Sequence, residues 1–130
     1  MLRKTVWAIA FGIVAAWTQA AFAGQQKLPT RVVALKIEQG TVKSADLVSG
    51  RPVGSIRITQ GNDIVLRWTS DQAVTLHLHG YNIEIKVPAN GAGEMRFRAR
   101  AAGRFPVERH EPGADPHTSK TLLYVEVYPR

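Results

Sequence analysis

The sequence predicts an all-β fold, a single sandwich of two packed sheets with seven or eight strands. Polar and apolar residues alternate at period two along most of the chain after Lys27, as in strands that bury one face. Turn-forming clusters of Gly, Pro, Asn and Asp recur about every 8–12 residues, a spacing typical of sandwiches and barrels. No segment has a convincing helical stripe of apolar residues.

The alternating segments follow one another with short turns between them. In 31–38, for example, Val33, Leu35 and Ile37 share one face. The expected strands cover 31–38, 55–59, 64–68, 74–79, 83–87, 95–100, 105–107 and 123–127. The turn-like separators are 49–52, 60–63, 88–91, 102–103 and 112–116. Residues 39–54 show no clear pattern, and both a short helix and a loop remain open for them.

Residues 1–23 have the layout of a secretory signal peptide. Arg3 and Lys4 form a positive start, an uncharged and mostly apolar run follows, and Ala21-Phe22-Ala23 fits a signal-peptidase site. The apolar run is about 13 residues long, whereas a membrane span needs roughly 20. We therefore expect cleavage after Ala23, a periplasmic product without a membrane span, and one domain over 24–130.

The composition excludes several kinds of site. The chain has no cysteine, so it has no disulfide, no thiolate nucleophile, no Cys-ligated zinc or iron–sulfur centre and no type 1 blue-copper site. With 45% hydrophobic and 21% charged residues it has the composition of a globular domain. Nucleic acid is not an expected partner, because the protein is predicted to be exported and has no basic motif interleaved with aromatic residues.

Histidines are the best candidates for chemistry. His77 and His79 are two apart on an expected strand, so both point to the face opposite Val74, Leu76 and Leu78. His110 ends a later strand, and His117 follows across a loop. Imidazole is a common ligand of copper and zinc, which makes these four residues a candidate metal site. The alternative is that the pair on the strand is an incidental feature of the surface.

Two segments around these histidines resemble cupredoxins. Residues 70–81, SDQAVTLHLHGY, resemble the cupredoxin strand that carries the first histidine ligand. Residues 102–110, AGRFPVERH, resemble the later strand that leads into the ligand loop, and the similarity covers about residues 55–130. The resemblance implies a cupredoxin-like Greek-key β-sandwich. It also implies that His79 or His77 is the first ligand and that His110 and His117 are loop ligands at the same pole.

The sequence departs from the cupredoxin pattern at the cysteine. That position falls on Arg109, and no axial methionine follows His117. Any metal would therefore have nitrogen or mixed nitrogen and oxygen ligands, which favours copper, with zinc second. Glu108 and Glu111 are candidate hydrogen-bond partners of the ligand imidazoles. Arg109 either turns out to solvent or fills the site and excludes metal; the four converging histidines favour the first arrangement.

The expected function is binding of copper, or another divalent metal, for carriage, storage or delivery. The alternative is a metal-free binding module that docks an acidic periplasmic protein through a basic stripe of Arg96, Arg98 and Arg100. A solvated outer face is the simpler interpretation of that stripe. We do not expect an enzyme: no nucleophile elbow and no phosphate-binding glycine loop is present, and a copper-dependent redox enzyme ranks third because so small a chain shows no substrate pocket and no second redox centre.

Overall fold

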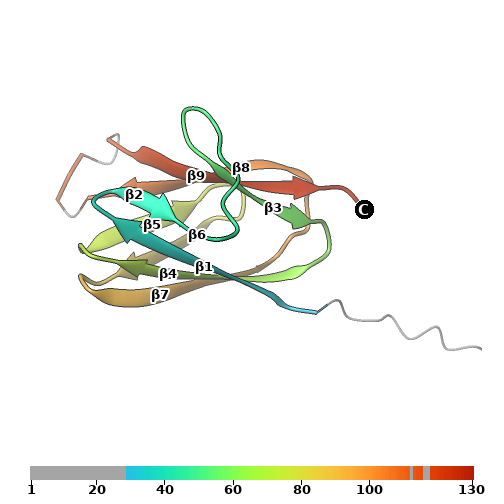
Figure 1. The fold of residues 1–130 in the computed structure, drawn as a ribbon, viewed down its shortest axis with the longest axis horizontal. Helices are drawn as coiled ribbons and strands as arrows, with labels where there is room; N and C mark the ends of the chain where they lie inside the picture. The colour runs from blue at the N-terminus through green and yellow to red at the C-terminus, as the bar shows by residue number, and fades with distance from the viewer. Residues whose placement is uncertain (1–28, 112, 116–117) are drawn as a thin grey trace, which may run out of the picture.

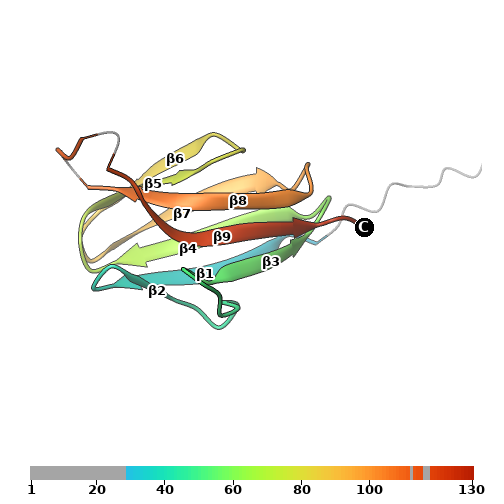
Figure 2. The same cartoon turned by 90° about the horizontal axis from the view of Figure 1, so that it is seen from above.

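The computed structural model describes residues 29–111, 113–115 and 118–130. In this part of the chain nine strands form two sheets that pack face to face (Figures 1 and 2). The strands are β1 (Arg31–Glu38), β2 (Thr41–Lys43), β3 (Ser55–Thr59), β4 (Asp63–Ser70), β5 (Val74–Leu78), β6 (Ile83–Val87), β7 (Gly91–Arg98), β8 (Gly103–His110) and β9 (Lys120–Tyr128). The predicted all-β sandwich is confirmed, while the signal peptide and its cleavage site lie outside the described residues.

The four-stranded sheet has the order β2-β1-β4-β7, and the five-stranded sheet has the order β3-β9-β8-β5-β6. Both sheets are mixed, because β1 pairs with β4 and β3 pairs with β9 in parallel. Inward-facing side chains of the two sheets form one core, in which Leu66, Trp68, Leu76, Leu78 and Leu123 have no exposed surface. Each such side chain contributes about 1.5–3 kcal/mol through burial. Within the described residues no helix is long and apolar enough to cross a membrane.

The strand count is nine instead of seven or eight because of β2. Gln39 and Gly40 both have positive φ, 49° and 73°, which makes the tight turn that returns the chain from β1 to β2. The strand has three residues, and only Val42 is buried, so period-two alternation cannot reveal it. The rest of 39–54 is a loop, closed by the bridge between Val48 and Ser55.

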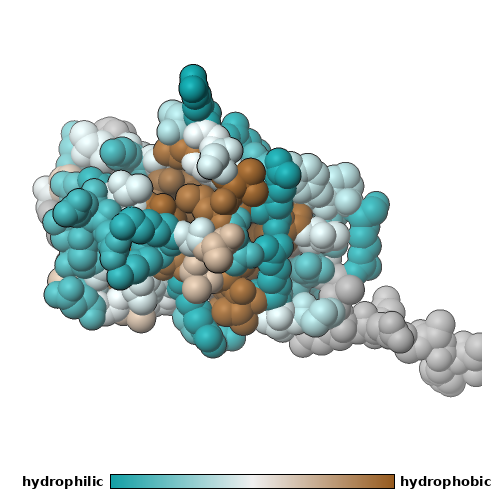
Figure 3. Space-filling model, viewed as in Figure 1, coloured by the Kyte–Doolittle hydropathy of each residue, from teal (hydrophilic) through white to brown (hydrophobic). Residues whose placement is uncertain are grey.

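This loop covers one edge of the sandwich. Leu47 packs against the core from it. Below the loop lies a hollow of about 410 Å³, lined in part by Pro52, Val53 and Leu122. In Figure 3 apolar surface gathers in the middle of this edge, over the region of β1, β3 and the loop.

A β-bulge adjusts the end of the five-stranded sheet where β8 finishes. Val107 pairs with Leu123 but Glu108 pairs with Thr121, so Leu122 has no partner on β8. Leu122 and Leu123 are both buried, with 6% and 0% of their surface exposed. A bulge bends its strand and increases the local twist. The bulged strand here is β9, so the bulge sets the direction in which its first residues run beside the end of β8.

Candidate functional site

The candidate site lies on the outer face of the five-stranded sheet, the face seen in Figure 2. Along β5, Val74, Leu76 and Leu78 are buried in the core, so Thr75 and His77 point outward. His77 lies opposite Glu84 on β6 and opposite Glu108 on β8. The outward orientation that the alternation predicts for His77 is therefore observed.

Two further histidines flank His77 on this face. His110 lies opposite Thr75, and the backbone N–H of His79 donates to the carbonyl of Pro106 over 3.0 Å. The ring centroids of His77 and His79 are 4.2 Å apart, and those of His77 and His110 are 6.3 Å apart. We refer to His77, His79, His110 and Glu108 together as the histidine face.

The ring separations around His77 would allow it to share a metal ion with one neighbouring histidine, either His79 or His110. An imidazole nitrogen binds its metal at about 2.0 Å, so the centroids of two rings on one ion lie roughly 4.5–6.3 Å apart. His77 meets this range with His110 and is close to it with His79. His79 and His110 are separated by four positions along β5, or roughly 13 Å of strand. Among the described residues no three His, Asp or Glu side chains stand ready to hold one ion.

Glu108 organises the imidazole beside it. His79 Nε2 lies 3.0 Å from Glu108 Oε2, so an Nε2–H donates to the carboxylate, and in the neutral form of the ring Nδ1 is the nitrogen that could bind a metal. A hydrogen bond from Ser119 is the main cause that lowers the pKa of Glu108, and the hydrogen bond and charge of His79 act in the same direction, while burial opposes them. The carboxylate therefore stays ionised and fixes the orientation of the ring, as partners of metal-binding histidines do.

Glu111, the other candidate beside the loop, has a different partner. Glu111 Oε1 instead accepts a hydrogen bond of 2.8 Å from Arg109 Nη2. His117 lies outside the described residues. His79 lies beside Pro106 and His110 beside Thr75, with the ring of His77 near both of their rings, and the meeting of His79 with the rest of the loop after β8 stays a prediction. The described histidines form a row along the sheet.

Arg109 points between the sheets and not to solvent, which corrects the arrangement that the sequence favoured. It lies opposite the buried Leu76, and its side chain is only 21% exposed. A Cβ on Gly40 would come within 2.9 Å of Arg109 Nη1, so the missing side chain of Gly40 makes room for the guanidinium. The alternation of β8 places Arg109 on the same side as the buried Val107, which is why the chain turns it inward.

A thiolate copper site does not fit this pole. The position of the cupredoxin cysteine holds Arg109, whose guanidinium is always charged and is no metal ligand. The small cavity around it is lined by Ile37, Gly40, Ser70–Val74, Arg109 and Glu111, and these include no imidazole. Sequence reasoning missed Gly40 and Asp71 here, although Gln39-Gly40 is a recognisable turn signal.

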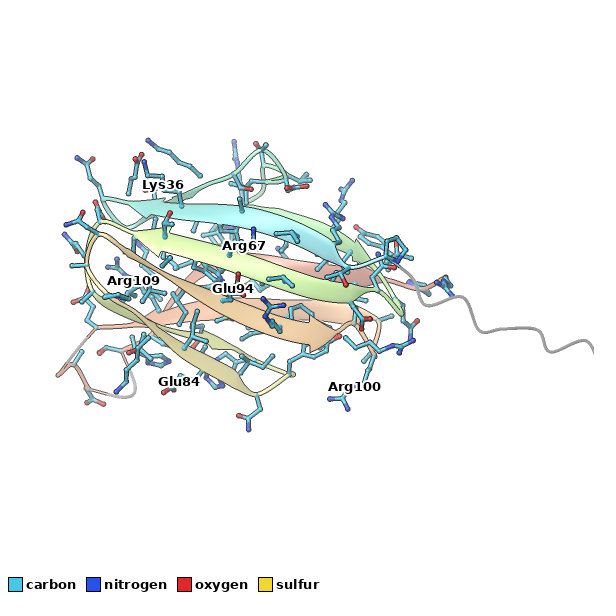
Figure 4. The ribbon with its side chains drawn as sticks, turned by 90° about the horizontal axis from the view of Figure 1, so that it is seen from below. Lys36, Arg67, Glu84, Glu94, Arg100 and Arg109 are labelled. Carbon is cyan, nitrogen blue, oxygen red and sulfur yellow. The ribbon has the colours of Figure 1, made fainter. Side chains whose placement is uncertain are left out.

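The basic stripe on the four-stranded sheet is partly neutralised. Arg96 and Arg98 face outward on β7. Glu94, also on β7, forms ion pairs with Arg96 of the same strand and with Arg67 of the neighbouring strand β4. Figure 4 shows Arg67 and Glu94 together on this face, with Arg100 beyond the end of the strand. These ion pairs also lower the pKa of Glu94, with the hydrogen bond from Arg67 as the largest cause.

Several solved structures share this fold. The chain matches a heme-copper terminal oxidase chain with 19% identity and a TM-score of 0.57, over 76% of this chain and 64% of that one. It matches the periplasmic domain of subunit II of cytochrome oxidase from Bradyrhizobium japonicum with 13% identity and a TM-score of 0.56, over 75% and 83% of the two chains. A copper-binding protein solved in its apo form matches with 11% identity and a TM-score of 0.54, over 80% and 93%.

These likenesses establish a cupredoxin-like fold and nothing finer, since all three identities are under 20%. The chain spans less than two thirds of the oxidase chain. No protein-family profile matches the sequence, and no curated protein matches it.

Proposed function

We propose that this is an exported copper-binding protein that holds Cu(II) on the outer histidine face for carriage or delivery. The observation that supports it is the position of His77, whose ring centroid lies 4.2 Å from that of His79 and 6.3 Å from that of His110. The role is binding and not catalysis. Export to the periplasm is part of the proposal and is based on residues 1–23 of the sequence.

The chemistry of the face favours Cu(II). Its donors are imidazole nitrogens and one carboxylate, and copper lies above zinc in affinity for such sites. The side chain of His79 is 42% exposed, so a metal bound there remains open to solvent and to other ligands. An open nitrogen site suits transfer of an ion better than permanent retention of it. Two structural neighbours, one named a copper-binding protein and one a heme-copper terminal oxidase, support the choice of copper.

A Cu(II) titration followed by electron paramagnetic resonance tests the proposal. We expect nitrogen coordination in the wild type and no thiolate-to-copper band in the visible spectrum. His77→Gln should weaken Cu(II) binding more than His79→Gln or His110→Gln, because His77 is the ring shared by both pairs.

Lys86→Gln is the matched control for these variants. Lys86 lies on the same outer face, opposite Thr75, and is exposed. It should leave the titration unchanged. A wild type that binds no Cu(II), or a loss with Lys86→Gln as large as with His77→Gln, would overturn the proposal.

Docking of an acidic protein through Arg96, Arg98 and Arg100 has less support. Glu94 neutralises part of that stripe through its pairs with Arg67 and Arg96. If the purified protein bound no metal, docking of an acidic protein would become the preferred function.

A further inference from the structure

One pole of the sandwich is built around a charged side chain. Three segments meet there: the turn at Gly40 between β1 and β2, the segment from Ser70 to Val74 between β4 and β5, and the end of β8. They enclose a cavity of about 20 Å³, with Arg109 reaching into it from β8. Figure 4 shows Arg109 at this end of the molecule, where the turns gather.

The carboxylate of Asp71 is the negative group at this pole that a cation would stabilise. Asp71 Oδ2 accepts the backbone N–H of Gln39 over 2.8 Å. Its second oxygen, Oδ1, is buried and has no hydrogen-bond partner among the described residues. A buried carboxylate oxygen without compensation is costly. Asp71 and Arg109 line the same cavity, and the space is large enough for one water molecule to bridge them.

The guanidinium of Arg109 is anchored on its solvent side as well. Arg109 Nη2 donates to Glu111 Oε1 over 2.8 Å, and Glu111 is 64% exposed. The guanidinium also lies close to Gly40, where a Cβ would meet Nη1 at 2.9 Å. Arg109 thus has the carboxylate of Glu111 on its solvent side and shares the cavity with the carboxylate of Asp71, a setting that suits a cation with several N–H donors.

We propose that Arg109 is the built-in cation of this pole and that the pole is a guanidinium-binding site filled by the chain itself. It occupies the position that the cupredoxin pattern gives to the copper thiolate. The fold is therefore complete without metal. The site is separate from the histidine face, so the proposal does not depend on copper binding.

Chemical rescue tests this proposal. Arg109→Ala should lower the Tm by about 4–8 °C, the effect of about 1–2 kcal/mol in a domain of this size. Millimolar methylguanidinium should then raise the Tm of Arg109→Ala along a saturating curve. It should not raise the Tm of the wild type or of Arg96→Ala, whose arginine pairs with Glu94 on the open surface.

Methylammonium at the same ionic strength is the second control. It has the charge but not the planar donors, so it should restore less than methylguanidinium does. Equal rescue by both cations, or rescue by neither of them, would overturn the proposal.

A second pair of variants covers the case in which Arg109→Ala does not fold. Asp71→Asn should lower the Tm of the wild type, because the cavity then keeps a cation without its buried partner. The same change should lower the Tm of Arg109→Lys by less, because the ammonium group fits the cavity less well and couples to Asp71 more weakly. Equal losses in both backgrounds would contradict the assignment.

Discussion

Gly80→Ala gives the sharpest test of how the histidine face is supported. Gly80 follows His79 directly and has a φ of 82°, a conformation that costs an L-residue roughly 1–2 kcal/mol. A Cβ there would lie 2.4 Å from Phe105 Cδ1 and 2.8 Å from Cε1. The Phe105 ring has little freedom to retreat, because it packs against Tyr81 at 5.0 Å between centroids and against Gly103.

The two costs add to a substantial loss of stability. Overpacking of this kind costs about 1–3 kcal/mol, so Gly80→Ala should destabilise the fold by about 2–5 kcal/mol in total. At roughly 4 °C per kcal/mol for a domain of about 100 residues, the Tm should fall by about 8–20 °C. Thermal unfolding followed by circular dichroism measures this directly.

Gly113→Ala separates the two costs. Gly113 has nearly the same φ, 78°, but an added Cβ there would meet nothing within 4 Å. It should therefore lose only the conformational part, about 1–2 kcal/mol. In a Phe105→Leu background the loss caused by Gly80→Ala should shrink, because the smaller side chain can move. Equal losses for Gly80→Ala and Gly113→Ala would show that the contact with Phe105 does not matter.

Three further predictions concern the charged groups. Arg109→Cys with Cu(II) should give no strong thiolate-to-copper band, because no imidazole lines that cavity; an intense visible band would show that a histidine reaches it. Glu108 has a lowered pKa, so its contribution to stability is present above the carboxyl's ordinary pKa and is lost as pH falls through the folded value; the Tm difference between the wild type and Glu108→Gln should therefore shrink in acid, and a constant difference from pH 7 to pH 3 would contradict this. Cu(II) affinity should fall steeply below about pH 6, where protons compete for imidazole nitrogens, and affinity that persists to pH 4 would point to carboxylate ligands.

Local alternation predicted most of the sandwich. The strands expected at 31–38, 55–59 and 83–87 agree with β1, β3 and β6. Alternation carries no information on which strands become neighbours, so the parallel pairs β1–β4 and β3–β9 could not be predicted from it. The bulge at Leu122 also escaped notice, since it interrupts a run of apolar residues that would be buried in either register.

The sequence predicted which side of the sheet the histidines face, but not where they lie along it. The sequence shows that His77 and His79 face away from the core, and the structure agrees. It does not show that β5 and β8 run antiparallel with Thr75 opposite His110, which sets His79 and His110 at different points along the sheet. The side chain of Arg109 lies in a cavity that is also lined by Gly40 and Asp71. Both residues are far from Arg109 in sequence, and no local pattern links them to it.

The end of β8 divides two tasks between neighbouring residues. Glu108 and His110 belong to the outer surface, while Arg109 between them closes the interior. Because successive side chains of a strand point to opposite sides, a mutation at either outer position leaves the inner position in place. Glu108 and His110 can therefore be substituted one at a time while Arg109 keeps its place in the interior. A substitution at Arg109 likewise leaves both outer side chains unchanged.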